Sequence, residues 1–70
     1  MKTLEDADIM PFGKYNGTRL EEVPAKYLLW LWNNGLKNDL KEDDDKGSVS
    51  RYIKNSMSAL KEEEPDIIVD

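Results

Sequence analysis

Apolar and aromatic side chains concentrate in one stretch of the chain, residues 9–36. It contains both tryptophans and the single phenylalanine, whereas the residues before it are mostly polar and acidic. Its first half is broken by glycines and a proline, and its second half holds the dense apolar run Tyr27–Trp32. This change of pattern predicts a turn-containing element followed by a helix.

Residues 9–20 carry a signal for a β-hairpin. Asn16 and Gly17 both tolerate the positive φ of a type I′ turn. With these two residues as the loop, Lys14 faces Arg19, while Tyr15 lies on the opposite face of the pair of strands. We therefore predict an N-terminal hairpin with one basic face.

A first helix is predicted near residues 24–34. Pro24 fits the first helical position, where its missing N–H is not needed, and Gly35 fits the left-handed position after the last turn. Leu36 then follows as the usual hydrophobic closure.

Apolar side chains cover well over half of this helix, so it must be either sandwiched or partly exposed. We predict Tyr27, Leu28 and Leu31 at the centre of the core. Leu29 and Trp32 are then expected nearer the rim, where they could contact a partner.

A second helix is predicted after a loop at residues 38–47. Ser48 is a suitable N-cap, and Pro65 disfavours helix at the residue before it, so the helix ends by about Glu63. Helical spacing marks its inward face as Val49, Tyr52, Ile53, Met57 and Leu60.

The predicted fold class is α+β: a small single domain with an N-terminal β-hairpin packed on two α-helices. Residues 1–8 are expected to form a flexible acidic N-terminus with little to bury, residues 9–64 the domain, and residues 65–70 a C-terminal tail. The β-prone segment Ile67–Val69 either lies against the hairpin edge or is disordered.

The charge distribution reduces the number of functional classes to be considered. The net charge is −5, but the two patterned segments are mildly basic and the acid lies in the flanks and the loop. Overall acidity argues against tight non-specific DNA binding, which depends on Lys and Arg, yet it leaves room for a local basic face.

The chain has no His and no Cys, so it lacks the commonest general base and the thiolate nucleophile. We expect no enzymatic activity and no cofactor. The run Asp43–Asp45 departs from the spacing of a calcium loop, so no metal is expected either. The apolar run falls far short of the roughly 20 residues that span a membrane, and we expect a soluble cytoplasmic protein.

With no enzymatic activity expected, we consider two binding functions, one for nucleic acid and one for a protein partner. Lys14 and Arg19 could engage phosphate while Tyr15 supplies a ring, which is the usual composition of a small nucleic-acid contact. Alternatively, Leu29 and Trp32 could anchor a protein, either a second copy of the chain or a nucleic-acid enzyme that the chain inhibits. The oligomeric state is left open.

The runs Met10–Gly17 and Val23–Leu31 resemble a small bacterial and phage family, described as putative quorum-sensing-regulated virulence factor, with the pattern MPFGKYKG…P..YL.WL. They are similar also to the C-terminal module of some exodeoxyribonuclease X-like proteins. The segment Tyr52–Glu62 with Pro65–Asp66 resembles the end of the phage members.

The resemblance implies a hairpin followed by helices, and its link to nucleases implies contact with nucleic acid or with a nucleic-acid-processing protein. Asn16 stands where the family usually has Lys, so one positive charge is missing from the hairpin. The resemblance implies no catalytic residue.

Overall fold

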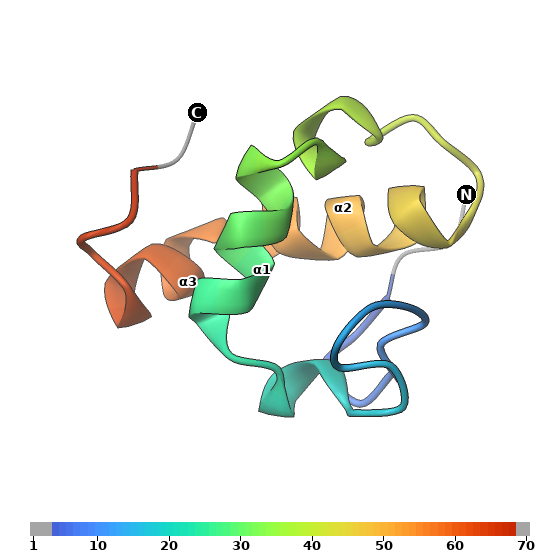
Figure 1. The fold of residues 1–70 in the computed structure, drawn as a ribbon, viewed down its shortest axis with the longest axis horizontal. Helices are drawn as coiled ribbons and strands as arrows, with labels where there is room; N and C mark the ends of the chain where they lie inside the picture. Colours follow the sequence, from blue (N-terminus) through green and yellow to red (C-terminus); the bar gives the residue numbers. More distant parts are fainter. Residues whose placement is uncertain (1–3, 69–70) are drawn as a thin grey trace.

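The computed structural model describes residues 4–68, and the part of the chain that it describes is helical. Figure 1 shows α1 crossing α2, while α3 follows directly from the end of α2, and both contact α1. In chain order the elements are the short 3-10 helix η1 (Leu20–Glu22), α1 (Ala25–Asn33), the 3-10 helix η2 (Leu36–Asn38), α2 (Asp45–Asn55) and α3 (Met57–Glu63).

The predicted β-hairpin does not form, so the α+β class is wrong for residues 4–68. Ile9 and Arg19 make an isolated antiparallel bridge, and no strand extends from it within these residues. Beside the bridge, the Met10 N–H donates to the Thr18 carbonyl at 2.8 Å, and the Gly17 N–H donates to the Met10 carbonyl at 3.0 Å. Residues 11–17 therefore form a closed loop, which we call the N-terminal loop.

The turn chemistry explains why the hairpin prediction failed. A type I′ turn needs positive φ at both central residues, but Gly17 has φ +91° and Asn16 does not have positive φ. The Thr18 N–H donates to the Tyr15 carbonyl at 3.0 Å, so Gly17 is the third residue of that turn, as in type II. Asn16 instead donates from Nδ2 to the Pro11 carbonyl at 3.1 Å and braces the loop from inside.

The segment at residues 4–8 packs on the domain, although we predicted little to bury there. Leu4 is buried in the core. The Asp6 carbonyl accepts from the Glu21 N–H at 3.1 Å, and the Asp8 carbonyl accepts from the Leu20 N–H at 2.9 Å. This segment thus runs beside η1 and extends the core, while residues 1–3 lie outside the described part of the chain.

The first helix lies where the sequence predicted it, except that Pro24 is its N-cap and not its first helical residue. α1 has Pro24 and Asn34 as its caps, one residue outside each end. Gly35 has φ +139°, so the helix ends on a backbone conformation that favours glycine, and Leu36 is buried immediately after it.

The second helix begins earlier than predicted, and the loop before it is correspondingly shorter. The N-cap is Asp44, whose Oδ1 accepts from the Gly47 N–H at 3.0 Å. Ser48, the predicted cap, is buried inside α2. An aspartate at this position satisfies a helix N–H and also suits the positive end of the helix dipole, so it displaces the serine.

Arg51 holds the loop that precedes α2. Its Nη1 donates to the carbonyls of Leu40 and Glu42, each at 2.8 Å. One guanidinium nitrogen therefore fixes two carbonyl groups in the loop between η2 and α2, which contains no helix.

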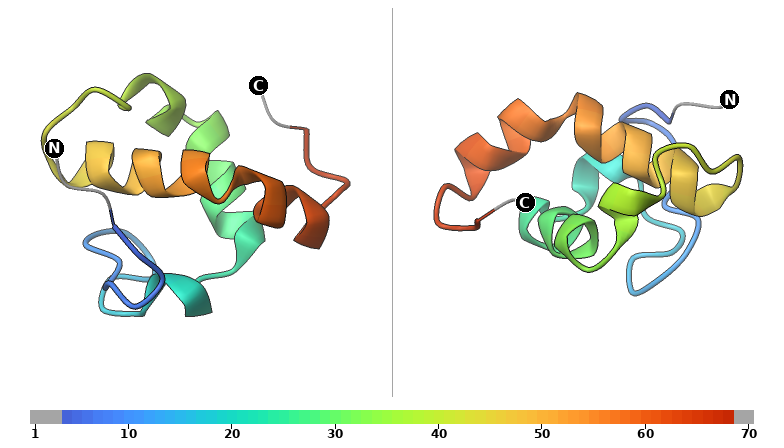
Figure 2. Two further views of the ribbon diagram at one scale, coloured as in Figure 1. Left: turned by 180° about the vertical axis from the view of Figure 1, so that it is seen from behind. Right: turned by 90° about the horizontal axis from the view of Figure 1, so that it is seen from above.

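The predicted single helix is divided in two at Ser56, and its end at Glu63 is confirmed. Ser56 has φ −102° and ψ 6°, and its N–H is shared between the carbonyls of Tyr52 and Ile53. The two helices consequently differ in direction (Figure 2). The break leaves Leu60 buried in the core beside α1.

The core lies between α1 and the α2–α3 pair, and it corrects part of the predicted burial. Leu28 is central, as predicted, while Tyr27 and Leu31 are half-buried. Leu29 is 0% exposed and Trp32 is 8% exposed, so their predicted rim position is wrong. The buried apolar set is Leu4, Met10, Leu20, Val23, Leu28, Leu29, Trp32, Leu36, Val49, Tyr52, Ile53 and Leu60.

None of the helices in residues 4–68 has the length and apolar character needed to cross a membrane.

Candidate functional site: an aromatic pocket on α1

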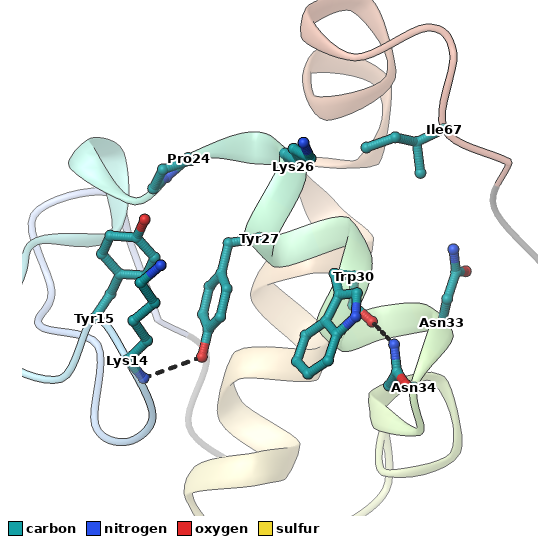
Figure 3. Close-up of a pocket in the computed structure, with 9 residues that line it drawn as sticks. All are labelled: Lys14, Tyr15, Pro24, Lys26, Tyr27, Trp30, Asn33, Asn34 and Ile67. Carbon is teal, nitrogen blue, oxygen red and sulfur yellow. Dashed lines mark hydrogen bonds between the residues drawn. The ribbon is translucent and has the colours of Figure 1, made fainter.

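An open pocket lies along the outer face of α1, between the N-terminal loop and the C-terminal segment (Figure 3). Its volume is about 580 Å³, within the range of roughly 300–1,000 Å³ common for small-ligand sites. We call it the aromatic pocket, and its lining residues are Lys14, Tyr15, Pro24, Lys26, Tyr27, Trp30, Asn33, Asn34 and Ile67.

Helical spacing brings the α1 residues of the pocket together. Lys26, Trp30 and Asn33 are separated by four and three positions, and Tyr27 with Asn34 flanks the same line. The opposite face of α1 is committed to the core, so this face is left outward. Trp30 is 55% exposed, which is unusual for so large an apolar side chain.

Three aromatic rings follow one another across the pocket, and we call them the aromatic row. Tyr15 and Tyr27 meet edge to face, with centroids 4.8 Å apart and planes at 66°. Tyr27 and Trp30 are nearly parallel, at 20°, with centroids 6.0 Å apart. Such contacts stabilise the arrangement of the rings, and Trp30 forms the open end of the row.

The N-terminal loop fixes the middle ring through a close backbone approach. The Lys14 N–H donates to the Tyr27 hydroxyl oxygen at 3.2 Å (Figure 3). Gly13, with φ +81°, lies so close that a Cβ there would be 2.5 Å from the same oxygen. The loop conformation and the absence of a side chain at Gly13 therefore both hold the Tyr27 ring in place.

The pocket has a positive charge balance within an acidic protein. Lys14 and Lys26 line it, and no Asp or Glu of the described residues does, although the chain has 15 acidic residues. The Lys14 Nζ lies 5.6 Å from the centroid of the Tyr15 ring, within reach of a cation–π contact. The site therefore offers aromatic faces and cations to a ligand, and none of residues 4–68 adds a carboxylate to its lining.

The C-terminal segment supplies the remaining wall. Ile67 is half-buried against the core cluster and lines the pocket, while the Ile68 carbonyl accepts from Asn33 Nδ2 at 2.7 Å. The sequence left two alternatives for this segment, either packing on a hairpin edge or disorder. Its described part instead lies against α1, and Val69 falls outside the described residues.

The structure brings only two of the three residues predicted to bind nucleic acid into one site. Lys14 and Tyr15 line the aromatic pocket together, whereas Arg19 does not line it. Arg19 instead lies 3.5 Å from a carboxylate oxygen of Glu21 and 3.6 Å from one of Glu22. The predicted partner-binding residues Leu29 and Trp32 are both buried in the core, and only a small part of Trp32 reaches the surface.

Sequence reasoning missed Lys26, Tyr27 and Trp30 as site residues. All three were visible in the sequence, at positions that share one side of the predicted helix. What the sequence did not indicate was which side of an almost uniformly apolar helix the rest of the chain would leave uncovered.

The family match covers the segment that supplies most of this pocket. Residues 3–40 match the family model described as "Putative quorum-sensing-regulated virulence factor". The chain belongs to this family, as its sequence motifs indicated. The description names a regulatory context and no mechanism.

A stretch of 23 residues is 68% identical to "Uncharacterized protein YpeB" of Escherichia coli strain K12, and equally to its counterpart in strain O157:H7. The match spans 33% of this chain and about a third (32%) of the length of these curated relatives. No solved structure matches. The similarity to exodeoxyribonuclease X-like modules is not among these findings and stays a prediction.

Proposed function

We propose that the protein is a non-enzymatic binding module whose aromatic pocket takes single-stranded nucleic acid. In this proposal a base stacks on Trp30, and the backbone phosphates lie near Lys14 and Lys26. The observation that carries it is the exposed Trp30 in one pocket with two lysines and, among the described residues, no carboxylate.

The chemistry of this combination favours a flexible polyanion that carries rings. Stacking of a base on an aromatic side chain contributes about 1–3 kcal/mol and tolerates any base, because every base has a π-face. Duplex DNA keeps its bases stacked internally, so it offers no free ring to Trp30. Single strands therefore suit the site better than duplexes do.

The charges set the expected strength and salt dependence. With two lysines near phosphates, the logarithm of the binding constant should fall with the logarithm of salt concentration at a slope of about −1.4. The net charge of −5 opposes any polyanion at longer range, so we expect modest affinity that is best seen at low salt.

A titration with a dye-labelled ten-residue oligothymidylate at low salt, followed by the fluorescence anisotropy of the dye, tests the proposal, because this signal does not depend on Trp30. Trp30→Ala should weaken binding at least fivefold, the lower end of a stacking contribution. Lys14→Gln and Lys26→Gln should each weaken it and reduce the salt slope.

Arg19→Gln is the matched control, because it removes the same charge outside the pocket. It should change binding less than either lysine substitution does. The absence of saturable binding at low salt would contradict the proposal, as would an equal effect of Arg19→Gln and Lys14→Gln, which would indicate only bulk charge.

The alternative is a protein-binding module, and exposure of Trp30 favours it too, because tryptophan is enriched among residues that dominate protein interfaces. Leu29 and Trp32 no longer support this alternative, since both are buried. A partner whose binding depends on Trp30 but neither on salt nor on Lys14 and Lys26 would favour it over nucleic acid.

A further inference from the structure

Trp30 lines a second, smaller pocket as well as the aromatic pocket. The two pockets share Trp30 and Asn34 and otherwise have different walls. The second pocket has a volume of about 250 Å³, and its distinctive residues include Phe12, Leu31, Asp39 and Lys46. Trp30 therefore stands as a partition between two neighbouring depressions on the surface of the protein.

The two depressions differ in size and charge. The first has two lysines and, among the described residues, no carboxylate, whereas the second combines Lys46 with Asp39 and is balanced. The second is less than half as large as the first, and it lies below the roughly 300 Å³ at which small-ligand pockets usually begin. Its aromatic and aliphatic walls, from Phe12 and Leu31, suit a flat ring without an accompanying phosphate.

We infer that the site binds two consecutive nucleotides of one strand, one on each side of Trp30; this rests on the proposed function. The first nucleotide occupies the aromatic pocket with its phosphate near Lys14 and Lys26. The base of the second enters the smaller pocket beside Phe12, while Asp39 disfavours a further phosphate there. A free mononucleotide fills only the first pocket, so the ligand class is an oligonucleotide.

Comparison of two small ligands separates the second contact from electrostatics. Thymidine 5′-monophosphate and the dinucleoside monophosphate TpT each carry one phosphate group, and the monoester carries the larger negative charge. Tighter binding of TpT therefore reports the second base and not additional phosphate. Stacking of one more base corresponds to about a fivefold to hundredfold gain in affinity.

NMR titrations of the wild-type protein with both ligands at one ionic strength are the first measurement. We expect TpT to bind at least fivefold more tightly than the mononucleotide. TpT should also shift the resonances of Phe12 and Lys46, which the mononucleotide leaves in place. Equal affinities, or shifts confined to the aromatic pocket for both ligands, would overturn the two-nucleotide inference.

Phe12→Leu then removes the ring while keeping an apolar side chain against the core. It should bring the affinity for TpT down to that for the mononucleotide, without changing the latter. An unchanged preference for TpT in this variant would overturn the assignment of the second base to this pocket. Failure of the proposed function is recognised separately, because the ten-residue oligothymidylate would then not bind at all.

Discussion

The hydroxyl of Tyr52 donates a hydrogen bond to Oδ1 of Asp6 across 2.7 Å and so joins α2 to a segment 46 residues earlier in the chain. Burial, and after it this hydrogen bond, raises the pKa of Tyr52 from 10.0 to about 12. Both effects favour the protonated phenol in the folded protein, because a phenolate there would be poorly solvated and close to a carboxylate.

Alkaline pH should therefore weaken this connection. Because the pKa of Tyr52 is higher in the folded state, the unfolded chain loses the phenolic proton first. The stability that the neutral phenol contributes is fully present below pH 10 and is lost as the pH rises through about 12. Tyr52→Phe should cost about 1 kcal/mol at neutral pH, the usual worth of one hydrogen bond.

Urea denaturation of both proteins from neutral to strongly alkaline pH checks this prediction. Taking the difference between the two proteins at each pH isolates the contribution of residue 52. The deficit of Tyr52→Phe should shrink above pH 10, and a deficit that stays constant with pH would refute the assignment.

Gly47→Ala should destabilise the protein even though alanine is the better helix former. A Cβ at Gly47 would lie 1.8 Å from the carbonyl oxygen of Glu42, which is backbone and cannot swing away. We expect a loss of about 1–3 kcal/mol or more from this overpacking, against a gain of about 1 kcal/mol from helix propensity. Thermal unfolding measures the balance.

Lys46→Ala is the control for Gly47→Ala, because it changes an exposed neighbour in the same turn of α2. Its effect should stay within about 0.5 kcal/mol. A more stable Gly47→Ala protein would show that the loop before α2 can move aside.

The elements that could be predicted from the sequence are those determined by local chemistry. Pro24 and Gly35 bracket α1 because each residue suits one particular backbone conformation, and these conformations hold regardless of what packs around the helix. The end of α3 at Glu63 follows in the same way from Pro65. The resemblance to the family implied the same fold as the residue patterns did, so it was not an independent prediction of these elements.

The features that were mispredicted depend on contacts between distant residues. Asn16-Gly17 is a strong local hairpin signal, but pairing of Met10 with Thr18 makes the loop longer than two residues. Likewise, Trp30 and Trp32 are alike in sequence terms, and only the position of α2 and α3 decides which is buried. When a helix has apolar residues on nearly every side, its sequence does not predict which side packs against the core.

Substitution of the two tryptophans should cost very different amounts of stability. Trp32→Ala should cost about 3–5 kcal/mol, because it opens a cavity in the core, while Trp30→Ala should cost much less. Urea denaturation of the two variants provides the comparison. Acrylamide should quench the fluorescence of Trp30 and largely spare Trp32, and equal costs or equal quenching would contradict the assigned burial.

Gly13→Ala and Gly17→Ala form a matched pair for the pocket. Both residues have positive φ, so each substitution should cost about 1–2 kcal/mol in backbone strain. A Cβ at Gly17 meets open space, whereas one at Gly13 collides with the Tyr27 hydroxyl. Only Gly13→Ala should displace the Tyr27 ring and weaken oligonucleotide binding, as measured by NMR shifts of Tyr27 and by titration.

Equal losses of binding in the two glycine variants would mean that general loosening of the N-terminal loop, and not the position of Tyr27, governs the site.

The break at Ser56 separates two helices that should differ in local stability. α2 buries six residues, while α3 beyond the break buries one, and acidic residues crowd its C-terminal end, where the helix dipole disfavours them. Amide protons of α3 should thus exchange with solvent through local opening, well before those of α2. Since the segment that follows α3 brings Ile67 to the aromatic pocket, one wall of the pocket belongs to the unit that opens first. We therefore expect a ligand to reach the pocket from this side without global unfolding of the core.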